Sequence, residues 1–280
     1  MSGRDARRAL LGLAYFLASG VALAFLVLPV LAIFVHVSPG KLIDQLSNPV
    51  VTDALIVSLK TTVLAQALIL LFGTPTAYLL ASRRFPGRSL CVTLVELPLV
   101  LPPAVAGIGL LAAFGRFGLL GSTLGWFGIG LPFTQAAVTV AVAFVASPLY
   151  VRQAIAAFEA VDPNLVAASR TLGVGPARTF FRVVLPLARG GLIAGEALAF
   201  ARGLGEFGAT IMFAGSLEKV TQTLPLAIYA QFEVNFDVTL AISALLILIS
   251  AALLISLKLA SQWQPSTPTS HSRFGLLSWS

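Results

Sequence analysis

Charged side chains are scarce in this sequence. Asp, Glu, Lys and Arg together make up 10% of the 280 residues, and hydrophobic residues make up 58%, against about 25% and 45–50% in an ordinary soluble domain. A water-soluble fold cannot bury so much apolar surface, so the composition predicts a protein that resides in lipid. The same composition is poorly suited to an enzyme that works in water.

Cysteine and histidine are nearly absent as well. Cys91 is the single cysteine, which excludes a disulfide within the chain and a cysteine-based metal site, and we interpret it as a small packing residue. His36 and His271 belong to no cluster of potential ligands, so a metal-dependent membrane enzyme is unsupported. No GxxxxGK[ST] motif occurs either, so any ATP hydrolysis is expected on a partner protein.

Long uncharged runs are what the sequence offers instead. A membrane-spanning helix needs about 20 apolar residues, and the first run is too long for the apolar part of a signal peptide. Six segments qualify, at about 9–35, 54–81, 90–114, 135–157, 187–213 and 238–260. We therefore predict an all-α integral membrane protein with about six transmembrane helices.

The net charge of +7 indicates membrane topology and gives no support for nucleic-acid binding. With a cytoplasmic N-terminus, thirteen of the eighteen Lys and Arg residues lie inside, as the positive-inside rule requires. This predicts two cytoplasmic termini. The expected divisions are 1–52 (cytoplasmic segment, first span and external loop), 53–261 (core transmembrane domain) and 262–280, a disordered cytoplasmic tail.

The cytoplasmic loop at 158–186 carries signals for a short helix. Asp162 is a suitable N-cap, Pro163 suits the first helical position, and Gly173 suits the left-handed conformation that ends a helix. A helix is therefore expected over 163–172, followed by a second helix that begins at Pro176.

Small and apolar residues follow one face of this short helix, including Leu165, Ala168 or Ser169, and Leu172. A helix of this kind could dock into a groove on another protein, or lie on the lipid headgroups. The residues alone leave both readings open.

The fifth span contains three charges at membrane depth, Glu196, Arg202 and Glu206. Arg202 and Glu206 are one helical turn apart, so they can neutralise one another, and such residues normally face a protein interior or a water-filled path. They either line or gate a translocation path or form a structural ion pair.

Glycines are concentrated in the same span. Small residues recur every four positions, at Gly191, Gly195, Ala199 and Gly203, which favours close helix packing, including across a dimer axis. A GxGxxG pattern at Gly203, Gly205 and Gly208 is expected inside an apolar helix. A dinucleotide fingerprint needs a strand before it, so that reading is disfavoured.

The third span is interrupted by prolines. Pro98, Pro102 and Pro103 each remove a backbone donor and must kink or break the helix that also carries Glu96. Broken helices at membrane depth are common where substrates pass, and a kink required only for packing is the alternative.

The run VAASRTLGVGPARTFFRVVLP, residues 166–186, resembles the loop signature of permease subunits in ATP-binding-cassette (ABC) importers. The resemblance implies a type I ABC importer permease fold whose short helix, the coupling helix, enters a cleft on a cytoplasmic ATPase. Ala167 stands where that family most often has glutamate. The implied coupling residues are Asp162, Pro163, Leu165, Ala167, Ala168, Ser169, Leu172, Gly173, Leu185 and Pro186.

The stretches LPLVLPPAVAGIGLLAAFGRFGLLG and LAFARGLGEFGATIMFAG resemble the molybdate branch of these permeases, and the resemblance covers about residues 53–260. It implies a homodimer, two ATPase subunits that bind ATP-Mg, and an external oxyanion-binding protein. Sulfate and tungstate permeases share much of the pattern. The predicted path or gate comprises Glu96, Pro98, Pro102, Pro103, Arg202, Gly203, Gly205, Glu206 and Gly208.

Two other classes remain as alternatives. A membrane enzyme would need clustered His, Asp or Glu residues on facing spans, and a secondary transporter usually shows an internally repeated set of spans. Neither pattern is visible in the sequence.

Overall fold

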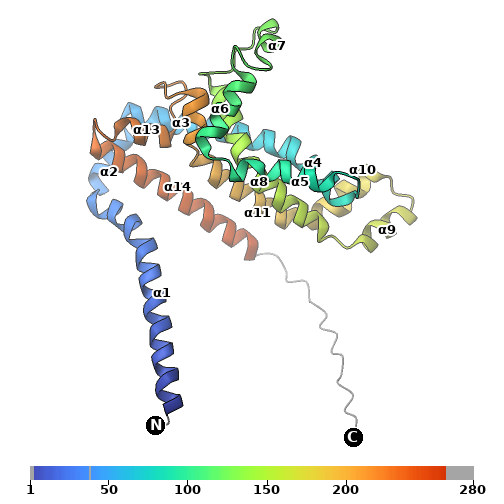
Figure 1. Cartoon of the computed structure of the whole chain (residues 1–280), viewed down its shortest axis with the longest axis horizontal. Helices are drawn as coiled ribbons and strands as arrows, with labels where there is room; N and C mark the ends of the chain where they lie inside the picture. Colours follow the sequence, from blue (N-terminus) through green and yellow to red (C-terminus); the bar gives the residue numbers. More distant parts are fainter. Residues whose placement is uncertain (1–2, 38, 263–280) are drawn as a thin grey trace.

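A computed structural model describes residues 3–37 and 39–262, and within these ranges every regular element is a helix (Figure 1). Five helical segments are long and apolar enough to cross a membrane, or six if α5 and α6 count as one broken span. The prediction of an all-α membrane protein is confirmed. Of the predicted tail, Gln262 is the last residue of a helix, and 263–280, with His271, lie outside the described residues.

Three spans are single helices: α1 (Gly3–His36), α8 (Gln135–Glu159) and α14 (Phe236–Gln262). Two are continuous segments with a π-helical turn inside: α3 (Pro49–Leu68), Ile69–Gly73 and α4 (Thr74–Ser82) form one, and α10 (Pro176–Thr179), Phe180–Val184 and α11 (Leu185–Leu204) form the other. The remaining span is the broken pair α5 (Arg88–Val100) and α6 (Pro103–Phe114). Shorter helices connect them: α2 (Pro39–Leu46), α7 (Gly121–Trp126), α9 (Pro163–Thr171), α12 (Gly208–Ala214) and α13 (Leu224–Gln231).

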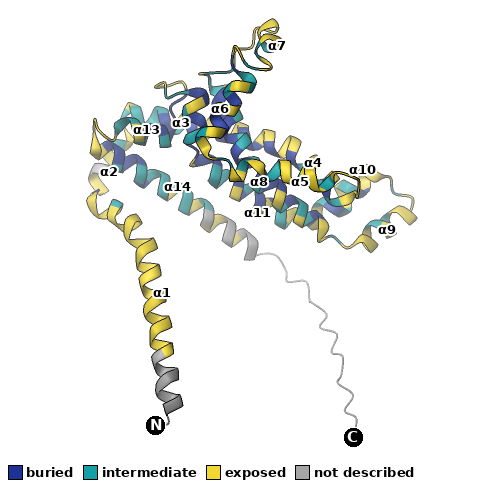
Figure 2. Cartoon of the chain, viewed as in Figure 1, coloured by how far each residue is buried: buried dark blue, intermediate teal, exposed yellow. Residues whose placement is uncertain are grey.

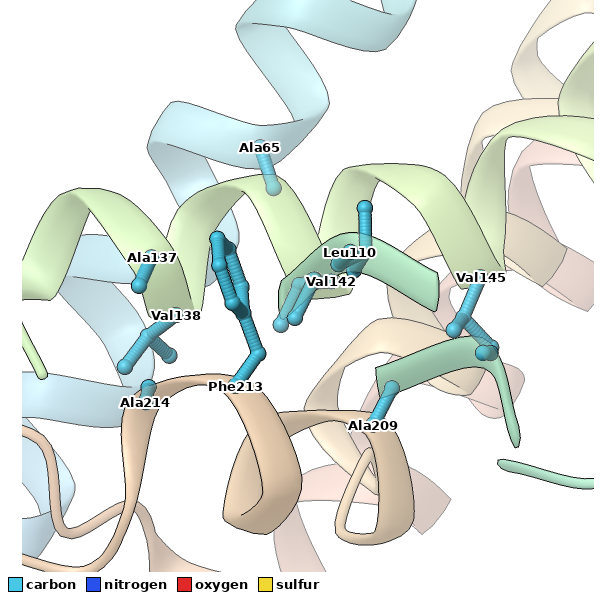
Figure 3. Close-up of a cluster of buried hydrophobic side chains, with 11 residues drawn as sticks. Ala65, Leu110, Ala137, Val138, Val142, Val145, Ala209, Phe213 and Ala214 are labelled. Atoms are coloured by element: carbon cyan, nitrogen blue, oxygen red, sulfur yellow. The ribbon is translucent and has the colours of Figure 1, made fainter. Parts of the chain in front are cut away.

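α8 is the central helix of the bundle, and it packs against α3, α4, α5, α11 and α12. Its buried residues are mostly small, which lets neighbouring backbones approach closely in lipid. Phe213 of α12 fills the space between Val138 and Val142 of α8, next to Leu110 of α6 (Figure 3). This cluster holds α6 and α12 against the centre of the bundle.

α1 leans away from the other helices and meets them only near its C-terminal end, beside α14 (Figure 1). Its large side chains from Leu11 to Val35 are exposed within the single chain (Figure 2). An apolar helix with no partner in its own chain must be covered by lipid or by another protein.

Two predicted spans differ from the structure. The third is broken, because α5 ends at Val100, Pro102 and Pro103 cannot continue its hydrogen bonding, and α6 starts at a bend of 116°. The fifth begins earlier and ends earlier than 187–213, running from Pro176 to Leu204. Gly205 follows its last residue, and Phe207 precedes the separate helix α12.

Candidate functional site

α9 projects beyond the ends of α8 and α11 (Figure 1). Its N-terminus is capped by Asp162, whose side chain accepts a hydrogen bond of 2.8 Å from the Asn164 N–H. At its other end Gly173 has a φ of +77°, and the N–H groups of Gly173 and Val174 bond back to the carbonyls of Arg170 and Ser169. Both predicted helix ends are confirmed.

The two sides of α9 have different surroundings. Leu165 and Leu172 are 47% and 82% exposed, and Ala168 is exposed beside them. On the other side Val166 packs against the core cluster around Phe158. The Ser169 hydroxyl lies 3.0 Å from that of Thr179, which ties α9 to α10. The leucine side is therefore free to contact another protein.

Leu185 and Pro186 lie apart from this helix. The predicted start of the second helix at Pro176 is confirmed. The sequence carried this helix only as far as Leu185 and Pro186, whereas the chain continues without a break into α11. A π-helical turn lies at this point: the Leu185 N–H bonds to the Phe180 carbonyl five residues back, and Pro186, which has no N–H to donate, directly follows this widened turn.

Arg202 and Glu206 form the predicted ion pair, with 2.7 Å between Arg202 Nη1 and Glu206 Oε2. The Glu206 side chain is 1% exposed and that of Arg202 is 33% exposed. The other carboxylate oxygen of Glu206 accepts the Ala209 N–H at 2.8 Å. The pair therefore bridges the end of α11 and caps the start of α12, joining two helices across a break.

The glycines around this break are packing positions. A Cβ on Gly203 would lie 2.8 Å from Val142 Cγ1, and one on Gly208 would collide with Pro103. Gly107 of α6 faces α12 in the same way, because a Cβ there would lie 2.6 Å from the Ala209 carbonyl oxygen. Close contact of the broken pairs α5–α6 and α11–α12 thus requires glycine on both sides. Gly205 has no such close neighbour.

The small-residue ridge of α11 is used within the chain. A Cβ on Gly191 would meet Ala157 at 2.5 Å, and one on Gly195 would meet Gln153 at 2.9 Å, both on α8. The prediction of close packing is confirmed. The extension of this ridge to a dimer axis is wrong, because α8 of the same chain occupies it.

Glu96 is placed apart from the Arg202–Glu206 pair. It faces α8, where its carboxylate lies 3.6 Å from the Arg152 guanidinium. Pro98 remains inside α5, whereas Pro102 and Pro103 make the break. The structure therefore joins Pro103, Gly208, Arg202 and Glu206 around adjacent breaks but leaves Glu96 and Pro98 outside this group.

Sequence reasoning missed a polar stripe on α3. Ser58, Thr61, Thr62 and Gln66 are all buried, and the Ser58 hydroxyl oxygen accepts the Leu224 N–H at 2.7 Å. Polar residues at spacings of three and four inside an otherwise apolar run were the available signal. The Gln66 amide nitrogen would be 3.3 Å from a Cβ on Gly203, so the stripe reaches the end of α11.

The chain is a bundle of membrane spans with two broken helices in it and one capped helix held beyond its end, the architecture of a multi-pass membrane permease. Within the described residues no group of three His, Cys, Asp or Glu side chains is suited to a metal ion. The family described as the inner membrane component of binding-protein-dependent transport systems matches residues 69–264. The chain belongs to this family.

Curated relatives are similar over most of the chain. The molybdenum transport system permease protein ModB of Escherichia coli (strain K12) is 44% identical over 212 residues, covering 75% of this chain and 92% of the relative. The sulfate transport system permease protein CysT of Salmonella typhimurium is 35% identical over 278 residues, covering 97% and 96%.

The fold is shared with a solved structure of a bacterial alginate ABC transporter in complex with an alginate-pentasaccharide-bound periplasmic protein. The TM-score is 0.68 at 17% identity, over 92% of this chain and 95% of that one. The predicted type I importer permease fold is confirmed.

Proposed function

We propose that this chain is the permease subunit of an ABC importer that moves molybdate across the cytoplasmic membrane by alternating access. The observation that carries this proposal is α9, a helix capped at both ends whose leucine side is free, in a chain of the importer permease family. The relative with 44% identity is named for molybdenum transport, and the sulfate relative is less similar.

The ATPase is a separate partner in this proposal. Leu165 and Leu172 enter a cleft on the ATPase dimer, which binds ATP-Mg, and the rigid caps at Asp162 and Gly173 pass its movement to the spans. Because α9 is tied to α10 through Ser169 and Thr179, and α10 continues into α11, movement of α9 is transmitted along one continuous helix to the Arg202–Glu206 break.

The gate lies at the paired breaks. Movement of α11 displaces α12, and the tight contact of Gly208 with Pro103 carries α6 with it. Arg202 is the one fixed cation at this break, and its partner Glu206 neutralises it in the present state. A path built from small residues, backbone donors and few free anions suits a tetrahedral oxyanion dianion.

Two copies of the chain form the transport unit, and an external oxyanion-binding protein delivers the ion. The N- and C-termini face the cytoplasm on this proposal. Arg88 binds Glu159 at 2.6 Å, which places the basic loop between α4 and α5 beside the start of α9. Basic residues from the loop between α4 and α5 and from the segment that contains α9 thus gather at one end of the bundle, as expected for the cytoplasmic side.

Competition for uptake tests the substrate. Cells that express the complete transporter would be given radiolabelled molybdate together with excess tungstate or sulfate. We expect strong inhibition by tungstate and weak inhibition by sulfate. Equal inhibition by sulfate would move the assignment to sulfate transport, and uptake that does not depend on the ATPase subunit would contradict the importer proposal itself.

A further inference from the structure

A cavity of about 900 Å³ lies at the end of the bundle where α9 projects. Its walls come from the end of α4, the loop before α5, the end of α8 and one side of α9. Three arginines line it, Arg84, Arg88 and Arg170, with Glu159 as the single acid. The cavity is therefore basic and is built from segments far apart in the sequence.

Only one of these arginines is neutralised. Arg88 donates through Nη2 to Glu159 at 2.6 Å and through Nε to the Leu80 carbonyl at 2.6 Å, so it is committed to holding α4, α5 and α8 together. Among the described residues Arg84 and Arg170 have no carboxylate partner. Two guanidinium groups without a carboxylate partner, one from the loop before α5 and one from α9, favour a ligand with a phosphate-like anionic group.

The cavity and the free leucines lie on different sides of α9. Pro163, Val166, Ala167 and Arg170 line the cavity, and their spacing of three and four residues defines one helical face. Leu165 and Leu172 are absent from that lining and are exposed. A ligand in the cavity is therefore compatible with a protein bound to the leucine side.

An apolar groove continues from the basic cavity along α4. Thr74, Pro75 and Tyr78 line the groove, whereas Tyr78, Ala81 and Ser82 line the cavity, so successive turns of one helical face pass from the groove to the cavity. The groove holds about 900 Å³ and reaches from Phe180 to Phe200, about 30 Å of helix. Apart from Glu196 and the hydroxyls of Thr74, Tyr78 and Tyr150, its lining is apolar.

We propose that an anionic phospholipid occupies both the basic cavity and the apolar groove. Its phosphate lies between Arg84 and Arg170, and one acyl chain follows the groove between α4 and α11. Basic pockets at the ends of membrane helices are suited to anionic headgroups, and the groove distinguishes a lipid from a free oxyanion, which would need only the basic cavity. The bound lipid braces α9 against the loop between α4 and α5.

Lipid retention by the purified full-length permease tests this proposal. Native mass spectrometry would compare retention of phosphatidylglycerol and phosphatidylcholine by the unaltered chain and by the double variant Arg84→Gln/Arg170→Gln. We expect phosphatidylglycerol to bind about thirtyfold more weakly to the variant, because each guanidinium near the membrane surface contributes about 1 kcal/mol. Phosphatidylcholine retention should not change. Arg83→Gln/Arg178→Gln is the matched control, because both residues are exposed and neither lines the cavity.

A second pair of variants adds charge instead of removing it. Ala167→Glu places a carboxylate in the cavity, and Ala168→Glu places one beside it, outside the lining; both positions are exposed and should tolerate the change. Only Ala167→Glu should release phosphatidylglycerol. The proposal is overturned if neither charge change alters retention, if inorganic phosphate alone displaces the lipid, or if the purified ATPase subunit displaces it, since the cavity would then be a free-anion site or a protein interface.

Discussion

α9 precedes the helical segment Pro176–Leu204, and the break between α11 and α12 follows it. These two regions are stabilised in different ways. α9 is held by its own caps at Asp162 and Gly173, and its largest side chains are exposed. The break is held from within by the ion pair of Arg202 and Glu206, and from outside by neighbouring helices that leave its glycines no room for a side chain. A substitution at α9 should therefore impair coupling without unfolding the protein, whereas a substitution at the break should affect stability first.

The largest effect is expected from Arg202→Gln. This change leaves the Glu206 carboxylate, which is 1% exposed, without its counter-charge, and removing one member of a buried ion pair costs about 3–5 kcal/mol. Thermal unfolding of the detergent-purified protein should occur at a clearly lower temperature. The double variant Arg202→Gln/Glu206→Gln should recover most of the loss, and the ion-pair account is wrong if it is as unstable as the single variant.

Gly107→Val should have the next largest effect. Its Cβ would lie 2.6 Å from the Ala209 carbonyl oxygen, so α6 and α12 must move apart, and overpacking of this kind costs about 1–3 kcal/mol. Gly109→Val is the matched control on the same helix, because a Cβ there meets nothing within 4 Å. Equal melting temperatures for the two variants would show that the α6–α12 contact is looser than described.

Gly173→Ala should have a smaller effect on stability and a clear effect on transport. The residue has a φ of +77°, which costs a residue with a Cβ about 1–2 kcal/mol, and the strain falls on the end of α9 alone. Uptake should decrease while the unfolding temperature stays close to that of the unaltered protein. Gly175→Ala is the control, since its φ of −67° suits alanine; if it reduces uptake equally, the left-handed cap is not the cause.

The smallest effect on stability is expected from Leu165→Ser/Leu172→Ser. Exposed positions without partners usually change the free energy of unfolding by less than about 0.5 kcal/mol, yet this variant removes the apolar side proposed to enter the ATPase. Substrate-stimulated ATP hydrolysis by the assembled transporter should fall, while Asn164→Ser, exposed on the same helix, should not reduce it. A large drop in melting temperature would mean that the leucines are packed in the chain itself.

Local signals made α9 and the spans predictable. The N-cap, the first-turn proline and the left-handed glycine lie within a few residues of one another, and length with apolarity is enough to find a membrane helix. The ion pair was also accessible, because residues four apart on a helix are neighbours. The prolines at 102 and 103 likewise predicted a break in the third span.

Features set by distant parts of the chain could not be predicted in this way. Arg88 and Glu159 are 71 residues apart, and nothing near Gly191 or Gly195 indicates that α8 of the same chain fills the ridge. The end of α11 at Leu204 was missed because its glycines read equally well as part of an apolar helix. The π-helical turn at Phe180–Val184 leaves no clear pattern in the sequence, so the link from α10 to α11 was missed as well.

Cross-linking from α9 to the ATPase tests the central claim most directly. Cys91 is exposed within the chain and not packed as expected, so it would first be replaced by serine. Leu172→Cys would then carry a short thiol-reactive cross-linker in the assembled transporter. We predict a specific adduct with the ATPase subunit and none from Ser122→Cys, which lies in α7, before α8 begins and so at the opposite end of that helix from α9. No adduct from position 172, or an equal yield from position 122, would contradict the account.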